Sequence, residues 1–178
     1  LGPQLELDYP PEDPPTCALR QISDPPPSPD GERLAFTALD RLYVSDTDGC
    51  DIRAVGQPDA TQQQPAWSPD GEWIAFTSWS EGEQAGHLQK VRVDGSELTR
   101  LSIRPAIYRN PVWSPDGTRV VALKGDARAY LENSGPGAAF AANEVVWFPA
   151  GGGEATLVMP ASGRSTPHFT QDPDRIYF

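Results

Sequence analysis

The sequence is poor in positive charge and contains no long apolar run. Its 14 Lys and Arg residues stand against 25 Asp and Glu residues, which gives a formal net charge of −11. A chain with this charge repels phosphate backbones and anionic lipid, so we expect neither nucleic acid nor a membrane surface among its partners. No stretch approaches the roughly 18 to 20 apolar residues that a membrane-spanning helix needs, so membrane insertion is not predicted.

Cysteine and histidine are also scarce, with two residues of each, and none of them lies in a recognisable catalytic or metal-binding motif. Cys17 and Cys50 have no CxxC spacing and no adjacent His, and their oxidation state stays open. His87 and His168 are not part of a His-x-His pair, and no Ser lies in a Gly-x-Ser-x-Gly elbow. We therefore predict no catalytic residue, no metal ligand and no cofactor for this chain.

Proline and glycine are abundant, with 20 and 16 residues among 178. Aromatic and branched aliphatic residues are too frequent for a disordered chain, so the composition indicates many short strands joined by turns. The length suits one compact domain or a piece of a larger protein. Residues 1–24 are rich in Pro, and we interpret them as a segment that wraps the outside of the domain or links it to an upstream part.

An internal repeat is the main signal in the sequence. The string Ser-Pro-Asp-Gly occurs at residues 28–31, 68–71 and 114–117, at spacings of 40 and 46 residues, and a degenerate copy follows Pro167. Pro presets the backbone of a tight turn, while Asp and Gly supply a side-chain hydrogen bond and a permissive backbone. We place the starts of the four repeats near residues 25, 65, 111 and 167. The predicted turn residues are Asp30, Gly31, Asp70, Gly71, Asp116 and Gly117.

Each repeat contains enough strand signals for four short strands. In the first repeat, apolar segments at 34–36 and 42–45 precede an Asp-Gly hairpin turn, and a last strand is predicted over 51–55. Four strands in 40 to 46 residues are typical of a propeller blade. The predicted fold class is therefore all-β, with residues 25–178 forming a partial β-propeller of about three and a half four-stranded antiparallel blades. We interpret residues 127–132 as an insertion loop despite their helical composition.

The repeat resembles that of a known family. Pro-x-Trp-Ser-Pro-Asp-Gly followed by an apolar strand is similar to the WD40-like (PD40) repeat of the TolB type, over roughly residues 20–178. More narrowly, segments 107–113, 144–147 and 167–178 resemble the propeller that precedes an amidohydrolase domain in long bacterial proteins. The resemblance implies a fragment of a six-bladed propeller, a bacterial source and a periplasmic or secreted location.

The sequence departs from the regular repeat at two places. The first copy has Pro27 where the next two copies have Trp67 and Trp113, so we expect an irregular first strand there. The sequence ends within the second predicted strand of the fourth repeat, so we expect open sheet edges and possible self-association through them. Trp67, Trp113 and the corresponding Phe169 are predicted to pack between blades.

The repeated aspartates are interpreted as turn residues and not as a cation site. Equivalent carboxylates in blades related by rotation are held apart, so Asp30, Asp70 and Asp116 do not form a ring around one ion. Residues 46–51 superficially resemble a calcium loop, but Gln57 occupies the position of the required Glu. We interpret this segment as a hairpin turn.

One face of the propeller is predicted to bind a partner. The connections between the second and third strands of a blade, and those between blades, emerge on the same face; here they are residues 79–87, 103–110 and 125–143. Trp79 is expected in such a connection, outside the repeat. The candidate residues combine aromatic rings with Arg, as protein interfaces do: Trp79, Tyr108, Arg109, Arg128, Tyr130 and Phe140.

These observations predict a non-catalytic propeller segment that mediates protein–protein or interdomain contact. The resemblance favours the N-terminal propeller of a larger amidohydrolase-like protein, with a following domain of the same chain or another protein as the partner. The alternatives are the propeller lid of a prolyl oligopeptidase-type serine peptidase and a stand-alone TolB-like envelope interaction protein. The sequence after residue 178 distinguishes them: His-x-His indicates the amidohydrolase, and Gly-x-Ser-x-Gly indicates the peptidase.

Overall fold

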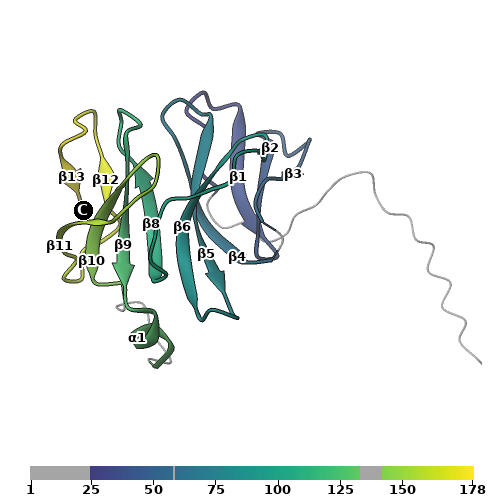
Figure 1. The fold of residues 1–178 in the computed structure, drawn as a ribbon. Coiled ribbons are helices and arrows are strands. Elements are labelled where there is room, and N and C mark those ends of the chain that lie inside the picture. Colours follow the sequence, from purple (N-terminus) through teal and green to yellow (C-terminus); the bar gives the residue numbers. More distant parts are fainter. Residues whose placement is uncertain (1–24, 58, 133–141) are drawn as a thin grey trace, which may run out of the picture.

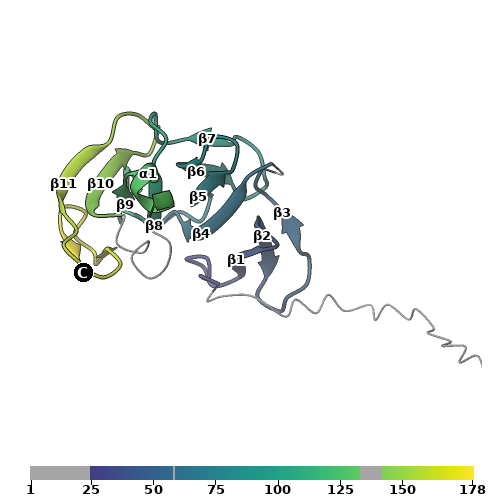
Figure 2. The same cartoon turned by 90° about the horizontal axis from the view of Figure 1, so that it is seen from below.

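The structure is a computed structural model that describes residues 25–57, 59–132 and 142–178. The Pro-rich segment 1–24, which includes Cys17, and the candidate interface residue Phe140 lie outside the described residues. Figure 1 shows the sheets standing side by side, and Figure 2 shows the same sheets in a second view, turned by 90°.

Four antiparallel sheets follow one another along the chain, one for each repeat. The first three correspond to blades in which consecutive strands are neighbours, and the fourth is a strand pair at the end of the chain. The sheets comprise β1 (Arg33–Ala38), β2 (Arg41–Asp46) and β3 (Arg53–Ala54); β4 (Thr61–Trp67), β5 (Trp73–Ser80), β6 (Ala85–Arg92) and β7 (Thr99–Arg100); β8 (Ile107–Trp113), β9 (Arg119–Gly125), β10 (Glu144–Pro149) and β11 (Thr156–Pro160); and β12 (His168–Phe169) with β13 (Ile176–Tyr177). The all-β prediction and the partial propeller are thereby confirmed.

The Ser-Pro-Asp-Gly segments form the turns between the first two strands of the blades. In the second blade, Ser68 Oγ donates a hydrogen bond to Asp70 Oδ1 at 2.5 Å and accepts one from the backbone N–H of Trp73 at 2.9 Å. Asp70 Oδ1 also accepts from the backbone N–H of Glu72 at 3.0 Å. Gly71 has a φ of +70°, in the left-handed region that favours glycine. The repeated tetrapeptide is thus a self-contained hydrogen-bonded turn.

Neighbouring blades are joined by tryptophan side chains and apolar contacts. The indole Nε1 of Trp113 donates to the carbonyl oxygen of Ala66 in the preceding blade at 3.1 Å, and Trp67 Nε1 donates to that of Pro26 at 2.9 Å. A cluster of buried apolar residues fills each of the three gaps between sheets. Because these contacts repeat along the chain, each blade is stabilised mainly by its neighbours.

The first blade is less regular than the next two. In the described residues, the segment that precedes its turn forms an isolated bridge between Pro27 and Leu34 and no longer strand, as expected from the absence of a Trp at this position. At the other edge, Arg53 and Ala54 alone form β3, which is shorter than the predicted strand over 51–55.

Two local predictions were wrong. Residues 127–132 form the helix α1 (Ala127–Glu132) and not a loop, because Asp126 Oδ1 accepts a hydrogen bond from the Ala129 N–H at 2.8 Å and Arg128 pairs with Glu132 at 2.8 Å. Trp79 lies in β5 and not in a connecting loop, since β5 and β6 pair along their full length and place Trp79 opposite Gly86. Likewise, residues 85–87 belong to β6 and residues 107–110 to β8.

Candidate functional site

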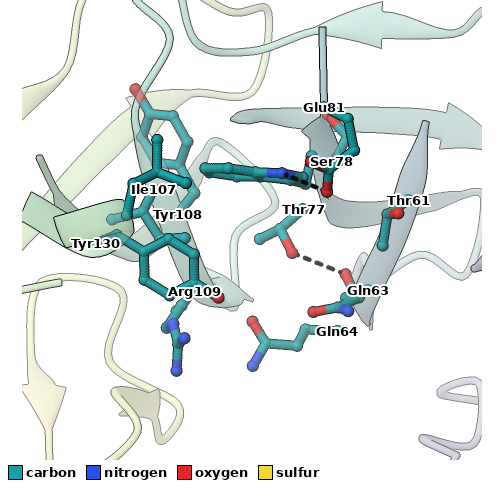
Figure 3. Close-up of a pocket in the computed structure, with 12 residues that line it drawn as sticks. Thr61, Gln63, Gln64, Thr77, Ser78, Glu81, Ile107, Tyr108, Arg109 and Tyr130 are labelled. Atoms are coloured by element: carbon teal, nitrogen blue, oxygen red, sulfur yellow. Dashed lines mark hydrogen bonds between the residues drawn. The ribbon is translucent and has the colours of Figure 1, made fainter. Parts of the chain in front are cut away.

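A cavity of about 360 Å³ lies between the second and third blades, and we call it the interblade cavity. Strands β4 and β5 form one wall, the start of β8 forms the opposite wall, and α1 contributes Tyr130 and Leu131. Figure 3 shows Thr61 and Gln63 across the cavity from Ile107 and Tyr130. The cavity therefore lies at the end of the two sheets where β4 and β8 begin, beside α1.

Aromatic rings and a guanidinium group form one end of the interblade cavity. Trp79 and Tyr130 meet edge to face, with ring centroids 5.4 Å apart, and the guanidinium carbon of Arg109 lies 5.6 Å from the centroid of the Tyr130 ring. The Trp79 Nε1 atom donates to a carboxylate oxygen of Glu81 at 3.2 Å. Aromatic and cation–π contacts of this kind hold the side chains in one arrangement before any partner arrives.

The other end of the cavity is polar and is built on two equivalent bulges. Gln64 and Asn110 have φ values of 55° and 50°, and the pairing of β4 with β5 and of β8 with β9 shifts register at each. Their side chains join across the blades: Gln64 Nε2 donates to Asn110 Oδ1 at 2.8 Å, and the Asn110 N–H donates to Gln64 Oε1 at 2.9 Å. Asn110 Nδ2 in turn donates to Thr166 Oγ1 at 3.1 Å, before the fourth sheet.

This chain of polar side chains was not predicted from the sequence, although a signal for it exists. Gln64, Asn110 and Thr166 each precede a Pro, and each stands four residues before the Ser or Thr that opens the turn position. Their side chains nevertheless differ in type, and the hydrogen bonds between them arise only when β4, β8 and the segment before β12 come together. The repeat position was visible in the sequence, but the contact was not.

The structure brings together four of the six predicted interface residues. Trp79, Arg109 and Tyr130 line the interblade cavity with Tyr108, whose ring is buried and packs against Phe148. The Tyr108 hydroxyl donates to the carbonyl oxygen of Arg104 at 2.8 Å, and burial raises the pKa of this phenol. Tyr108 therefore supports the wall and offers little surface to a partner.

The remaining two predicted interface residues do not line this cavity in the described part of the chain. The exposed side chain of Arg128 projects from α1 and pairs with Glu132, and Phe140 lies outside the described residues. Among the described side chains that line the interblade cavity, Glu81 is the only carboxylate, and none is a His or a Cys. The hydroxyl groups of Thr77 and Ser78 donate to backbone carbonyl oxygens, and Glu81 accepts from Trp79, so these described lining groups are not paired as a nucleophile and its base.

The described residues contain neither a cluster of metal ligands nor a membrane-spanning helix. Within residues 25–57, 59–132 and 142–178, no three His, Cys, Asp or Glu side chains lie close enough together to hold a metal ion. The aspartates of the repeated turns are exposed, and hydrogen bonds from Ser28 and Ser114 lower the pKa values of Asp30 and Asp116. None of the described helices has the length and apolar character needed to cross a bilayer.

The chain is similar to two curated peptidase-type proteins. It is 35% identical over 88 residues to the uncharacterized peptidase YuxL of Bacillus subtilis. The matched region covers 46% of this chain and 13% of that protein. It is 34% identical over 108 residues to tricorn protease homolog 1 of Streptomyces coelicolor, which covers 61% of this chain and 10% of that protein. The chain thus spans only about a tenth of the length of the curated relatives it matches.

Comparison with solved structures and with family models gives the same fold. TolB from Acinetobacter baumannii superposes on 88% of this chain and 37% of its own, with a TM-score of 0.62 and 15% sequence identity, which shows the shared fold alone. The family model described as the TolB beta propeller domain matches residues 20–134, more than half of the sequence. This match, together with the repeated turns and interblade tryptophans, shows that the chain belongs to the TolB beta propeller domain family.

Proposed function

We propose that this chain is a non-catalytic propeller segment of a larger peptidase-type protein, and that the face with the interblade cavity contacts another domain of that protein. The observation that carries the proposal is the convergence of Trp79, Arg109 and Tyr130 at one cavity whose described lining residues include no His and no Cys. Aromatic and Arg side chains held in a hollow are typical of the centres of protein interfaces.

Exposed apolar side chains extend this surface beyond the cavity. Leu39 lies between β1 and β2, Ile103 between β7 and β8, and Leu131 in α1 between β9 and β10, and they are 91%, 59% and 45% exposed. These connections emerge at the same end of the blades, and Leu131 also lines the interblade cavity. Large apolar side chains exposed on one face are a feature of protein interaction sites.

The peptidase-type parent is favoured over the amidohydrolase parent by the relatives. YuxL is named a peptidase and the Streptomyces coelicolor protein a tricorn protease homolog, and most of the length of each lies outside the match. The amidohydrolase-like parent and a stand-alone envelope interaction protein are the alternatives. A periplasmic or secreted location is proposed from the resemblance to TolB propellers.

The complete sequence of the parent protein and a binding measurement test the proposal together. The sequence should contain a Gly-x-Ser-x-Gly elbow outside these 178 residues; a His-x-His metal motif there would overturn the peptidase assignment. The domain that carries the elbow is then produced separately and titrated into the chain by calorimetry. The chain alone should hydrolyse neither peptide nor ester substrates.

Two variants of cavity residues and one control variant test whether the added domain binds at the interblade cavity. Tyr130→Ala and Arg109→Ala should each weaken binding of the separate domain by about tenfold or more, as loss of an interface anchor does. Leu98→Ala removes an exposed apolar side chain from the connection between β6 and β7, at the opposite end of the blade, and should bind like the parent chain. Equal affinities for all four proteins, or no binding at all, would overturn the interdomain role.

Light scattering over a dilution series accompanies the titration, because the chain's own association through open blade edges would compete with domain docking. If the measured mass stays equal to that of one chain at every dilution, the calorimetric signal comes from binding of the added domain. A stable multimer that excludes the domain would contradict the proposal.

A further inference from the structure

A second cavity, of about 200 Å³, lies on the other side of the second blade, and we call it the polar cavity. It is formed by β5, β6 and β7 together with the connection from the first blade. Most of the side chains that line it are polar or charged, and those that carry the argument are Asp59, Ser78, Glu83, His87, Gln89 and Arg100.

The polarity of this cavity is unusual for its place in the sheet. Side chains on one face of a strand recur at every second residue, so Ser78 shares a face of β5 with Ile74 and Phe76. Ile74 and Phe76 are fully buried in the apolar cluster between the first and second blades. The same face that is apolar at one end of the strands becomes polar where it meets the cavity, although Gln89 and His87 are each only 5% exposed there.

Gln89 presents a buried acceptor that no described group satisfies. Its Nε2 atom donates a hydrogen bond to Ser78 Oγ at 3.1 Å. The Ser78 hydroxyl donates its own proton to the carbonyl oxygen of His87 at 3.3 Å. This arrangement sets the orientation of the amide, since Ser78 has no second proton to donate to Gln89. Gln89 Oε1 is left without a hydrogen-bond donor among the described residues. Buried polar atoms almost always have partners, so this oxygen points to a missing donor.

The charged groups around the cavity indicate which kind of donor fits. Glu83 and Asp59 supply carboxylates, and Arg100, on the neighbouring strand β7, supplies a guanidinium group. Burial, and then the charge of Arg100, lower the pKa of His87, which favours the neutral imidazole, although the Glu83 carboxylate lies 3.8 Å from His87 Nε2. The lining therefore offers acceptors and negative charge for a cationic donor, and one positive group for an anion.

We propose that the polar cavity binds a small zwitterion of the α-amino acid class. Its ammonium group donates to Gln89 Oε1 near the carboxylates of Glu83 and Asp59, and its carboxylate pairs with Arg100. A volume of about 200 Å³ is below the range of roughly 300–1,000 Å³ that holds drug-sized ligands, which limits the ligand to a few heavy atoms. Ser78 is the one lining residue that the two cavities share among the described residues, and the assignment of the polar cavity does not rest on the interdomain role proposed above.

The experiment is a titration of the isotope-labelled chain with L-alanine, followed through the side-chain amide resonances of Gln89. We expect a saturable shift with L-alanine and none with N-acetyl-L-alanine, which lacks the ammonium group. L-alanine amide keeps the ammonium group without the carboxylate, and it should bind at least tenfold more weakly than L-alanine, a loss of about 1.4 kcal/mol.

Three variants distinguish the loss of a ligand contact from a loss of folding. Gln89→Leu removes the orphaned acceptor at similar volume and should abolish L-alanine binding as measured by calorimetry. Arg100→Gln changes an exposed side chain, so folding is preserved; it should weaken L-alanine binding at least tenfold and leave binding of L-alanine amide unchanged. Gln171→Leu makes the same chemical change as Gln89→Leu on the exposed turn between β12 and β13, and it should bind like the parent chain.

The proposal is overturned by any of three results. They are the absence of a Gln89 shift with L-alanine at tens of millimolar, an equal response to N-acetyl-L-alanine, and an unchanged L-alanine affinity in Arg100→Gln. The first two use the unmodified chain, so they decide the question even if Gln89→Leu fails to fold.

Discussion

Replacement of Trp113 by Phe tests whether neighbouring blades are held together by the indole hydrogen bond. Trp113 is 7% exposed, and its Nε1 atom donates to the carbonyl oxygen of Ala66 in the preceding blade at 3.1 Å. Phe retains an aromatic ring in the same cluster but has no donor. The variant therefore removes one contact between blades and part of the ring volume.

The expected loss of stability has two parts. A hydrogen bond of this kind contributes about 0.5–1.5 kcal/mol net, and the loss is larger when its acceptor stays buried without a donor. The smaller ring also buries less apolar surface and leaves a small void, which costs about 1 kcal/mol. The free energy of unfolding should fall by about 2–3 kcal/mol. For a chain of this size, that corresponds to a decrease in Tm of about 4–12 °C.

The measurement is thermal and urea unfolding of Trp113→Phe beside the control Trp147→Phe. Trp147 lies half-buried in β10, and no hydrogen bond from its indole to another described residue is found. Trp147→Phe should therefore cost less than about 1 kcal/mol, because it loses ring surface but no hydrogen bond. Equal losses for the two variants would refute the role assigned to the Trp113 indole.

Three further predictions concern the turns and one strand. Gly117→Ala should cost about 1–2 kcal/mol in urea unfolding, because Gly117 has a φ of +70° while an added Cβ would meet only Pro69 at an ordinary distance of 3.8 Å. Gly86→Ala should cost about 3 kcal/mol or more and reduce the soluble yield, because its Cβ would lie 2.2 Å from the carbonyl oxygen of Ser78. Ser114→Ala should destabilise the chain at neutral pH, with the difference from the parent chain shrinking as the pH falls below 3.8, the ordinary pKa of Asp.

The sign of the pH effect follows from the direction of the pKa shift. The hydrogen bond from Ser114 lowers the pKa of Asp116 in the folded chain, so its stabilisation is fully present above the unfolded pKa and is lost as the pH falls through the folded pKa. A difference between parent and variant that stayed constant from pH 7 to pH 2 would contradict this linkage. For the glycines, Gly151→Ala is the control, because Gly151 has no positive φ and an added Cβ would meet no atom within 4 Å; it should be close to neutral.

The fold could be predicted from the sequence because its signals are local and repeated. Each Ser-Pro-Asp-Gly turn is closed by hydrogen bonds within six residues, as between Ser68, Asp70 and Trp73, so its sequence specifies its geometry directly. The strand alternation on either side is equally short in range. The same reasoning underestimated α1, where one Asp cap and one Arg–Glu pair stabilise a helix too short to give a periodic signal.

Four residues of the interblade cavity were predicted to share one face, but the cavities themselves could not be predicted, because each joins residues that are separated in the sequence. Gln64 and Asn110 meet only when two bulged strands from successive blades lie side by side. Gln89 looks like any strand residue in the sequence, and its unsatisfied oxygen is apparent only once the Ser78 hydroxyl is known to donate elsewhere. The turns, the strands and their pairing within a blade follow from local sequence, since those interactions are made within a repeat. The side chains that face each other across the gaps between blades are visible only in the structure, because those contacts depend on how neighbouring sheets pack.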